Sequence, residues 1–418
     1  MDRDVGNGRR LLPMALWTVL LPLPLLAAPS AAEPTFPEGF TATVFADGVG
    51  RARHIAVRDN GDLYVALRSG GGIVALRDED RDGRADRQET LAAETGTGIA
   101  VRGAHLYFSS DTAVYRVPLA ANELLPSGEI EAVVEGFPRQ RSHASKAFAF
   151  DDASGLYVNV GAPSNACQEE DRTRGSPGLS PCPQLESHAG VWRFEADRPG
   201  QSFAEGQRFA TGVRNTVAIA WDPASRSLYL VQHGRDQLHD NWPELYTPED
   251  SATQPAEEFH RLAEGLNAGW PYTYWDQRHS ERMVAPEYGG DGKTPSNEEG
   301  YARPLIDFPA HWAPNALVFY DGEAFPPQYR NGAFIAFHGS WNRTPFSQEG
   351  FNVVFLPFTG GEPAQNYQVF ADGFAGSEAP ASPREAEYRP MGLAVGPDGA
   401  LFISDSTRGR IWRVTYAE

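Results

Sequence analysis

Six copies of one strand pattern recur along this chain, and such an internal repeat constrains the fold more than any other feature of the sequence. Each copy has an apolar alternation, a polar turn and a second strand that usually contains Leu-Tyr or Leu-Phe. The copies begin at His54, Gly98, Ala147, Ala218, Ala316 and Gly392. Period-2 alternation between turn residues is typical of strands, and no long segment shows convincing helical periodicity. The chain is therefore expected to be all-β.

A further strand recurs between these copies. It is found at residues 41–50, 131–137, 207–213 and 367–374. Four strands repeated about six times predict a six-bladed β-propeller with four-stranded blades over residues 36–418. The first of these strands has no blade before it and the last copy lacks its outer strand, so we expect residues 40–46 to close the ring. A pair of β-sandwiches is the alternative, which six similar units disfavour.

The N-terminal segment has the pattern of an export signal. Arg9 and Arg10 precede an apolar run at residues 11–28, and small residues follow it. We expect residues 1–32 to be a cleaved signal peptide, which predicts a periplasmic or secreted protein with no membrane span after cleavage. A membrane anchor is the alternative, but prolines interrupt the run.

The cysteine and charge content fit that location. Cys167 and Cys182 are the two cysteines of the chain, and an oxidising compartment favours a disulfide between them. No C-x-x-C-H motif is present, so no attached c-type haem is expected. The formal net charge of −19 disfavours nucleic acid and anionic lipid as partners.

The segment Asp78 to Glu89, DEDRDGRADRQE, fits the twelve-residue pattern of a calcium loop. The expected oxygen ligands come from Asp78, Asp80, Asp82, the carbonyl of Arg84, Asp86 and Glu89. Gly83 would permit the sharp turn. A solvated acidic turn is the alternative interpretation. A fully ligated loop leaves no open position for chemistry, so the expected role of this calcium is structural.

Several polar residues occupy equivalent places in the repeat, just before a first strand or just after a second one. They are His143, Arg214, Asn215, His233, Gly234, Arg235, His311 and Arg389. Taken singly, each has an ordinary explanation as a surface or blade-bridging residue. Converging on one channel, a histidine and several arginines would favour an anionic ligand and supply a base. The longest insertion, between about residues 236 and 315, is expected on the binding face. This pattern indicates an oxidoreductase or hydrolase pocket.

Six segments also resemble a known family. RSHASKAFAF, GVRNTVAIAW, VQHGRDQL, LNAGWPYTYW, WAPNALVFY and YRPMGLAVGPDGALF occur in the order found in soluble quinoprotein sugar dehydrogenases. Over residues 36–418 the chain resembles the glucose/sorbosone dehydrogenase group, most of all its L-sorbosone dehydrogenase-like branch. The resemblance implies a six-bladed propeller that uses pyrroloquinoline quinone (PQQ) and Ca²⁺.

The resemblance also implies roles for individual residues. His143 matches the catalytic base, and Arg214 and Asn215 match the pair beside the reactive carbonyl and the cofactor. Gly234 and Arg235 match positions whose backbone carbonyls bind the calcium of the cofactor. Further cofactor contacts are implied for His233, His311, Arg343 and Arg389.

Some positions depart from the family pattern. Ser142 stands where the well-known glucose enzymes have an acidic residue, and Glu387 stands where a second arginine is expected. The cofactor-contacting lysine has no clear match; its region holds His338, Trp341, Asn342 and Arg343. These departures argue against carrying over glucose itself as the substrate.

The resulting functional hypothesis is a PQQ- and calcium-dependent dehydrogenase that oxidises an aldose or related sugar aldehyde. Electrons would pass to an external acceptor, such as a cytochrome or a quinone. Two alternatives are a calcium-dependent propeller lactonase and a non-catalytic propeller that has lost its cofactor.

Overall fold

Six blades, each built on four antiparallel strands, form the propeller in the computed structural model, which describes residues 1, 33–68 and 70–417. Short fifth strands extend three of these sheets. Residues 2–32, to which the predicted signal peptide belongs, lie outside the described residues. None of the helices in the described part of the chain has the length and apolar character that a membrane span requires.

The blades follow the predicted repeat, each running from a first, inner strand to an outer one. Blade 1 contains β2 (Ala52–Val57), β3 (Leu63–Leu67), β4 (Ile73–Arg77) and β5 (Arg87–Leu91). Blade 2 contains β6 (Ile99–Arg102), β7 (His105–Ser109), β8 (Ala113–Pro118) and β9 (Glu131–Glu135). Blade 3 contains β10 (Phe148–Phe150), β11 (Gly155–Val160), β12 (Gly190–Glu195) and β14 (Gln207–Thr211).

The remaining blades complete the ring. Blade 4 contains β15 (Thr216–Asp222), β16 (Ser227–Gln232), β17 (Glu257–Leu262) and β21 (Ile306–Phe308). Blade 5 contains β22 (Pro314–Tyr320), β23 (Gly332–His338), β24 (Phe351–Thr359) and β26 (Gln368–Ala371). Blade 6 contains β27 (Pro390–Val395), β28 (Leu401–Asp405), β29 (Ile411–Tyr416) and β1 (Phe40–Ala46).

Strand β1 closes the ring as the sequence predicted. It pairs antiparallel with β29, with Phe40 opposite Tyr416 and Val44 opposite Trp412. The first strands of blades 1 and 6, β2 and β27, also contact each other. The N-terminal and C-terminal strands therefore belong to one blade.

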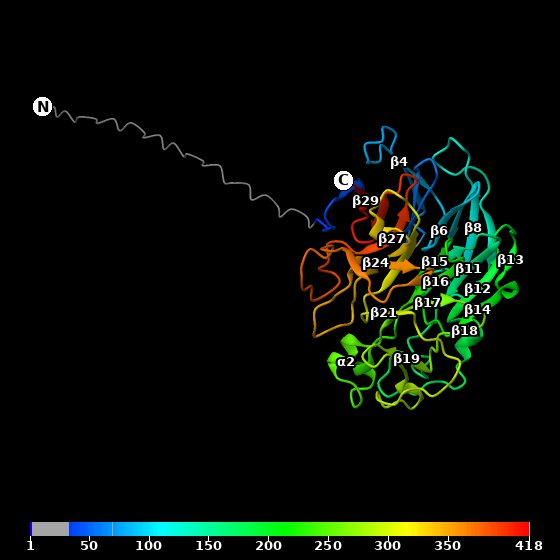
Figure 1. The fold of residues 1–418 in the computed structure, drawn as a ribbon, viewed down its shortest axis with the longest axis vertical. Helices are drawn as coiled ribbons and strands as arrows, with labels where there is room; N and C mark the ends of the chain where they lie inside the picture. Colours follow the sequence, from blue (N-terminus) through cyan, green and yellow to red (C-terminus); the bar gives the residue numbers. More distant parts are fainter. Residues whose placement is uncertain (2–32, 69, 418) are drawn as a thin grey trace. The chain divides into compact units, whose positions relative to one another are not determined.

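Short elements decorate the blades. These are β13 (Gln201–Ser202), β18 (Leu266–Asn267), β19 (Thr273–Asp276), β20 (Glu281–Val284), β25 (Glu362–Pro363), helices α1 (Leu238–Asn241) and α2 (Pro248–Thr253), and 3₁₀ turns at Pro183–Glu186, Phe203–Glu205, Pro286–Tyr288 and Pro327–Tyr329. The long insertion holds α1, α2 and the β19–β20 hairpin. Helix α2 and β19 lie together at one end of the propeller unit (Figure 1). The insertion also contains β17 and β21, two blade strands that the sequence analysis did not identify.

Six apolar clusters fill the spaces between neighbouring blades. In β3, Leu63 and Val65 pack in the cluster shared with blade 6, whereas Tyr64 and Ala66 pack in the cluster shared with blade 2. Alternate side chains of a strand point to opposite faces, so this central strand is apolar at every position. The core therefore lies between the blades and leaves the centre of the ring to polar residues.

Candidate active site

A cavity of about 590 Å³ lies at the centre of the ring, and residues from all six blades line it. Its walls come from segments just before first strands, such as His143 before β10, and just after second strands, such as His233 after β16. Seven of the predicted site residues line it: His143, Arg214, Asn215, His233, Gly234, His311 and Arg389. A volume of this size is typical of small-molecule and cofactor sites.

His143 is held in one orientation by its loop. Its Nδ1 lies 2.7 Å from the carbonyl oxygen of Ala162, and because a carbonyl only accepts, Nδ1 carries the hydrogen. Nε2, which makes no hydrogen bond to any described residue, is then the unprotonated nitrogen. Burial and the charge of Arg214 lower the pKa of His143 to about 3, so the imidazole is neutral at physiological pH.

The loop itself is fixed by Gln140 and Gly161. The Gln140 amide donates to the carbonyls of Ser142, His143 and Gly161 at 2.8, 3.1 and 2.9 Å. His143 has a φ of +52°, a left-handed conformation that is uncommon for a residue with a Cβ. A Cβ at Gly161 would lie 2.7 Å from both Asn215 Oδ1 and His143 Cβ, so only glycine permits this close approach.

A chain of amide and imidazole hydrogen bonds crosses the cavity wall beside His143. The Asn159 amide donates to Asn215 Oδ1 at 3.3 Å, and the Asn215 amide lies 3.5 Å from His233 Nδ1. His233 Nε2 lies 3.2 Å from Asn315 Oδ1. Burial and Arg214 lower the pKa of His233 to about 4, which keeps this relay uncharged.

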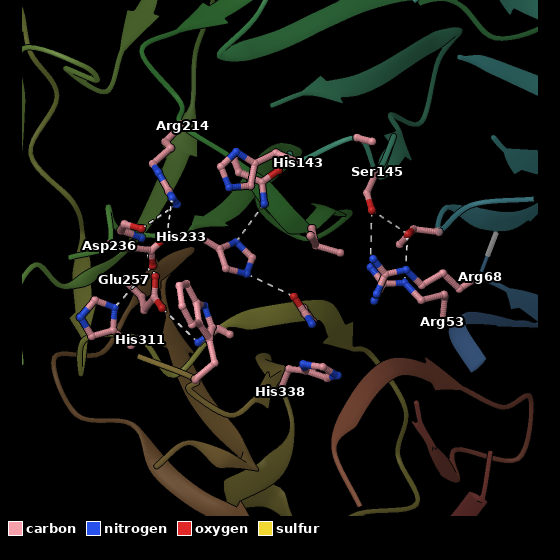
Figure 2. A pocket seen from close by; sticks show the side chains of 18 of the residues that line it. Arg53, Arg68, His143, Ser145, Arg214, His233, Asp236, Glu257, His311 and His338 are labelled. Carbon is pink, nitrogen blue, oxygen red and sulfur yellow. Dashed lines mark hydrogen bonds and ion pairs between the residues drawn. The ribbon is translucent and has the colours of Figure 1, made fainter. Parts of the chain in front are cut away.

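Arg214 and Asp236 form a buried ion pair at one side of the cavity (Figure 2). Arg214 donates to Asp236 Oδ2 and to the Gly234 carbonyl, both at 2.8 Å. Arg172 donates to the same Asp236 oxygen at 2.8 Å, and Asn342 donates to Oδ1 at 2.9 Å. Although burial favours the neutral acid, the two arginines hold the pKa of Asp236 well below its usual value.

Glu257 is a second carboxyl group at this side of the cavity. It is 2% exposed and accepts hydrogen bonds from the backbone amides of Gly234, at 2.7 Å, and Ala313, at 3.0 Å. It has no ion-pair partner among the described residues. Burial, with Asp236 nearby, raises the pKa of Glu257 to about 8.

Arg389 lines the cavity from blade 6, just before β27. Its guanidinium donates to the carbonyls of His338 and Gly339 at 2.8 and 2.7 Å. It forms no ion pair with any described carboxylate, so its charge is available to a ligand. Burial lowers the pKa of Arg389 to about 10, which still leaves it charged at neutral pH.

The side chains of two predicted site residues turn away from the cavity, although the prediction for Arg235 concerned its backbone carbonyl alone. The Arg343 guanidinium donates to the Ala252 carbonyl at 2.7 Å and pairs with Glu349 at 2.6 Å. The Arg235 side chain pairs with the buried Glu287. His311 does line the cavity, with Nε2 donating to the Ser251 carbonyl at 2.8 Å. Burial lowers the pKa of His311.

The predicted calcium loop lies between β4 and β5, at the outer edge of blade 1. Carboxylate oxygens of Asp78, Asp80 and Asp86 lie within 4.8 Å of one another. Asp82 instead accepts from the Arg84 amide at 2.8 Å. Glu89 belongs to β5 and pairs with Arg87. The structure thus brings three of the predicted carboxylates together, and calcium binding here stays a prediction. The predicted disulfide between Cys167 and Cys182 is present.

Other residues of the cavity escaped the sequence analysis. They are Arg53, Arg68, Thr97, Asp111, Asp236, Glu257 and Asn315. Arg53 precedes the first strand pattern of blade 1 as His143 precedes that of blade 3, so its place in the repeat was a usable signal. Glu257 carried no such signal, because β17 had not been identified as a strand.

The sequence profile of the TrAA12-like family matches residues 34–417. A pyrroloquinoline quinone-dependent pyranose dehydrogenase of Coprinopsis cinerea is 25% identical over 240 residues, which cover 50% of this chain and 31% of that protein. A pyrroloquinoline quinone-dependent sugar dehydrogenase of Hypocrea jecorina is 22% identical over 411 residues, 91% of this chain and 88% of that protein.

An uncharacterised protein of Borreliella burgdorferi is 31% identical over 210 residues, 50% of this chain and 48% of that protein. The matched part thus spans less than half of the B. burgdorferi protein and less than half of the C. cinerea enzyme.

Solved structures share the fold. The family AA12 enzyme of Trichoderma reesei superposes with a TM-score of 0.76 at 19% identity, covering 94% of this chain and 99% of that one. The holo PQQ domain of the C. cinerea pyranose dehydrogenase gives a TM-score of 0.71 at 19% identity, covering 92% and 97%. At these identities the likenesses establish the six-bladed propeller.

Proposed function

Because the chain belongs to the TrAA12-like family, among the soluble PQQ-dependent sugar dehydrogenases, we propose that it oxidises an aldose or a related sugar aldehyde with PQQ and Ca²⁺. Electrons then pass to an external acceptor such as a cytochrome or a quinone. A periplasmic or secreted location is part of this proposal. The apolar run at residues 11–28 and the disulfide, which suits an oxidising compartment, support it.

The observation that carries the proposal is the state of His143. It is neutral, its Nδ1 is tied to the Ala162 carbonyl, and its Nε2 is a free acceptor at the cavity wall. An imidazole held in this way can take the proton of a sugar hydroxyl. Arg214, fixed by Asp236, places a positive charge on the same wall, where it can stabilise negative charge that develops on an oxygen.

The cavity fits an anionic aromatic cofactor. Arg389 offers an unpaired guanidinium, which suits a ligand carboxylate. The relay through Asn215 and His233 provides hydrogen-bonding groups, and Asn342 Oδ1 is a buried acceptor without a hydrogen-bond partner among the described residues. When bound, PQQ supplies the electrophilic carbonyl that accepts the hydrogen and electron pair from the sugar carbon.

A calcium ion also fits at the Glu257 side of the cavity. Carboxylate and backbone carbonyl oxygens are the ligands that Ca²⁺ prefers. The Gly234 carbonyl already accepts one hydrogen bond from Arg214 and keeps a second lone pair. Glu257 adds a carboxyl group that forms no ion pair with any described residue. We therefore assign Gly234 and Glu257, with the Arg235 carbonyl as predicted from the sequence, to the calcium.

The direct test of this function is reconstitution. Purified protein loaded with PQQ and Ca²⁺ should reduce a redox dye when supplied with members of an aldose panel, and chelation of calcium should stop it. Absence of PQQ binding would refute the proposal. Lactone hydrolysis by the calcium-loaded protein without PQQ would support the lactonase alternative instead.

The lowered pKa of His143 predicts the acid side of the pH profile. Since the folded protein keeps the imidazole neutral until the pH falls to about 3, the base stays competent well below its ordinary value of 6.5. We expect kcat/KM to stay within about threefold between pH 7 and pH 5. Measurement of kcat/KM in a constant-ionic-strength buffer checks this, and a fall with an apparent pKa of 6 to 7 would contradict it.

The close approach of Gly161 to His143 and Asn215 predicts that a larger residue at this position lowers kcat. In the Gly161→Ala variant, the added Cβ must displace His143 or Asn215, whose atoms lie 2.7 Å from its position. A displacement of this kind is expected to lower kcat by about tenfold or more. The melting temperature, measured in parallel, separates local displacement from loss of fold. Unchanged kcat in a normally folded variant would show that His143 needs no such precise placement.

A further inference from the structure

The cavity has a second group of positive charges, apart from the Arg214–Asp236 pair. In Figure 2, Arg53 and Arg68 lie on the opposite side of His143 from Arg214 and Asp236. Both arginines line the cavity. The chain carries a net charge of −19, so a basic wall in this one place needs an explanation.

Arg53 is buried without a counter-ion. It is 8% exposed, and its guanidinium donates to Thr97 Oγ1 at 3.0 Å, to Ser145 Oγ at 3.5 Å and to Met391 Sδ at 3.0 Å. All three acceptors are neutral. Burial and the positive charge of Arg68 lower the pKa of Arg53 to about 9. A buried charge that lacks a partner is costly, and an anion would compensate it.

Three other buried arginines show the usual arrangement. They pair with carboxylates: Arg214 with Asp236, Arg235 with Glu287 and Arg282 with Glu258. Arg53 differs from each of them, because no described carboxylate lies within ion-pair distance of it. Among the buried arginines of the described residues, Arg53 alone lacks a carboxylate within ion-pair distance; Arg389, which is only partly buried, also lines the cavity without one.

Arg68 adds an exposed charge to the same wall. Its side chain is exposed and makes no hydrogen bond or ion pair to any described residue. Asp111 also lines the cavity, but it is exposed and forms no ion pair with either arginine. A ligand carboxylate could thus meet both guanidinium groups without breaking an existing contact.

The position of Arg53 and Arg68 relative to His143 indicates that the carboxylate they would bind belongs to the sugar substrate. Ser145, which accepts from Arg53, lies on the same loop as His143, two residues further on. Of the cofactor contacts predicted above, Arg214 and His311 lie on the other side of His143 in Figure 2. A substrate whose hydroxyl reaches His143 Nε2 would extend toward Arg53 and Arg68.

We propose that Arg53 and Arg68 form a carboxylate subsite and that the sugar oxidised is anionic, of the uronic acid class. This rests on the proposed function for the oxidation itself, whereas recognition of the carboxylate belongs to the protein alone. The reaction on the sugar is unchanged: His143 would take the hydroxyl proton, and a bound quinone would supply the acceptor for the hydrogen and electron pair that leave the oxidised carbon.

The test measures binding and turnover separately. Calorimetric titration of the apo protein and of the PQQ-loaded protein with D-glucuronate and D-glucose gives the two dissociation constants, and dye reduction gives the ratio of kcat/KM. We expect glucuronate to bind at least about tenfold more tightly than glucose, as one charge-assisted contact allows. High salt should weaken this preference.

Variants then locate the subsite. Arg68→Gln, which removes an exposed and unbonded side chain, should fold normally and lower the glucuronate preference by about tenfold, and Arg53→Lys should retain part of it. Arg226→Gln, far from the cavity and paired with Asp152 on the surface, should change nothing.

Two results would overturn the inference. One is equal binding of glucuronate and glucose in both forms of the wild-type protein. The other is an Arg68→Gln variant with weaker PQQ binding and an unchanged sugar preference, which would assign these arginines to the cofactor. Failure to bind PQQ would instead refute the proposed function. The carboxylate subsite would still be tested in that case, because calorimetry measures glucuronate binding to the apo protein.

Discussion

Replacing His143 with glutamine is expected to lower kcat of the PQQ- and calcium-loaded protein by about 10²-fold or more. Glutamine keeps a hydrogen-bonding group of similar reach but cannot accept the hydroxyl proton at Nε2, and removal of a general base typically has an effect of this size. The measurement is dye reduction at saturating sugar, together with a PQQ titration that shows the variant still binds the cofactor.

His105→Gln is the matched control for this experiment. His105 lies in β7 of blade 2 and does not line the cavity, so the same substitution there should leave kcat unchanged. If His143→Gln retains wild-type kcat with PQQ bound, His143 is not the base, and the sugar hydroxyl does not react beside it.

Replacing Arg214 with methionine is expected to cause the largest loss of stability. Asp236 would keep Arg172 but lose its buried partner, and the removal of one member of a buried ion pair typically costs about 3–5 kcal/mol. Urea denaturation of the apo protein at pH 7 gives the change in the free energy of unfolding. A loss below about 1 kcal/mol would show that the pair does not organise this wall.

The pH dependence and a surface control complete this prediction. The pKa of Asp236 is depressed in the folded protein, so its stabilising contribution is present above the ordinary carboxyl pKa and is lost as the pH falls below it. Arg214→Met should reduce that dependence. Arg226→Met, which removes an exposed ion pair with Asp152, should change stability by no more than about 0.5 kcal/mol.

The fold was predictable because a propeller is built from local repeats. Strand patterns close in sequence form each blade, and even the closing strand at residues 40–46 was identified, since the last unit lacked an outer strand. Strand β17 was missed for a physical reason. Its buried residues include Glu258 and His260, which satisfy each other and Arg282 inside the protein, so the strand lacks an apolar alternation.

The site was predictable only in part. Position in the repeat identified His143, Arg214 and Arg389, because equivalent ends of inner strands meet at the centre of the ring. It did not reveal that Arg235 turns toward Glu287, nor that Glu257 lies against Gly234, since these contacts join residues from separate segments of the chain. Tertiary neighbours, which a motif does not specify, decided which side chains face the cavity.

The most direct test of the central claim is a single turnover without an acceptor. Protein loaded with PQQ and Ca²⁺ is mixed anaerobically with sugar, and the absorbance of the bound quinone is followed in a stopped-flow instrument. We predict loss of the oxidised quinone spectrum at a saturable rate that falls by about 10²-fold in His143→Gln. A quinone spectrum that stays unchanged with every sugar tested, uronic acids included, would contradict the assignment of this protein as a quinone-dependent sugar dehydrogenase.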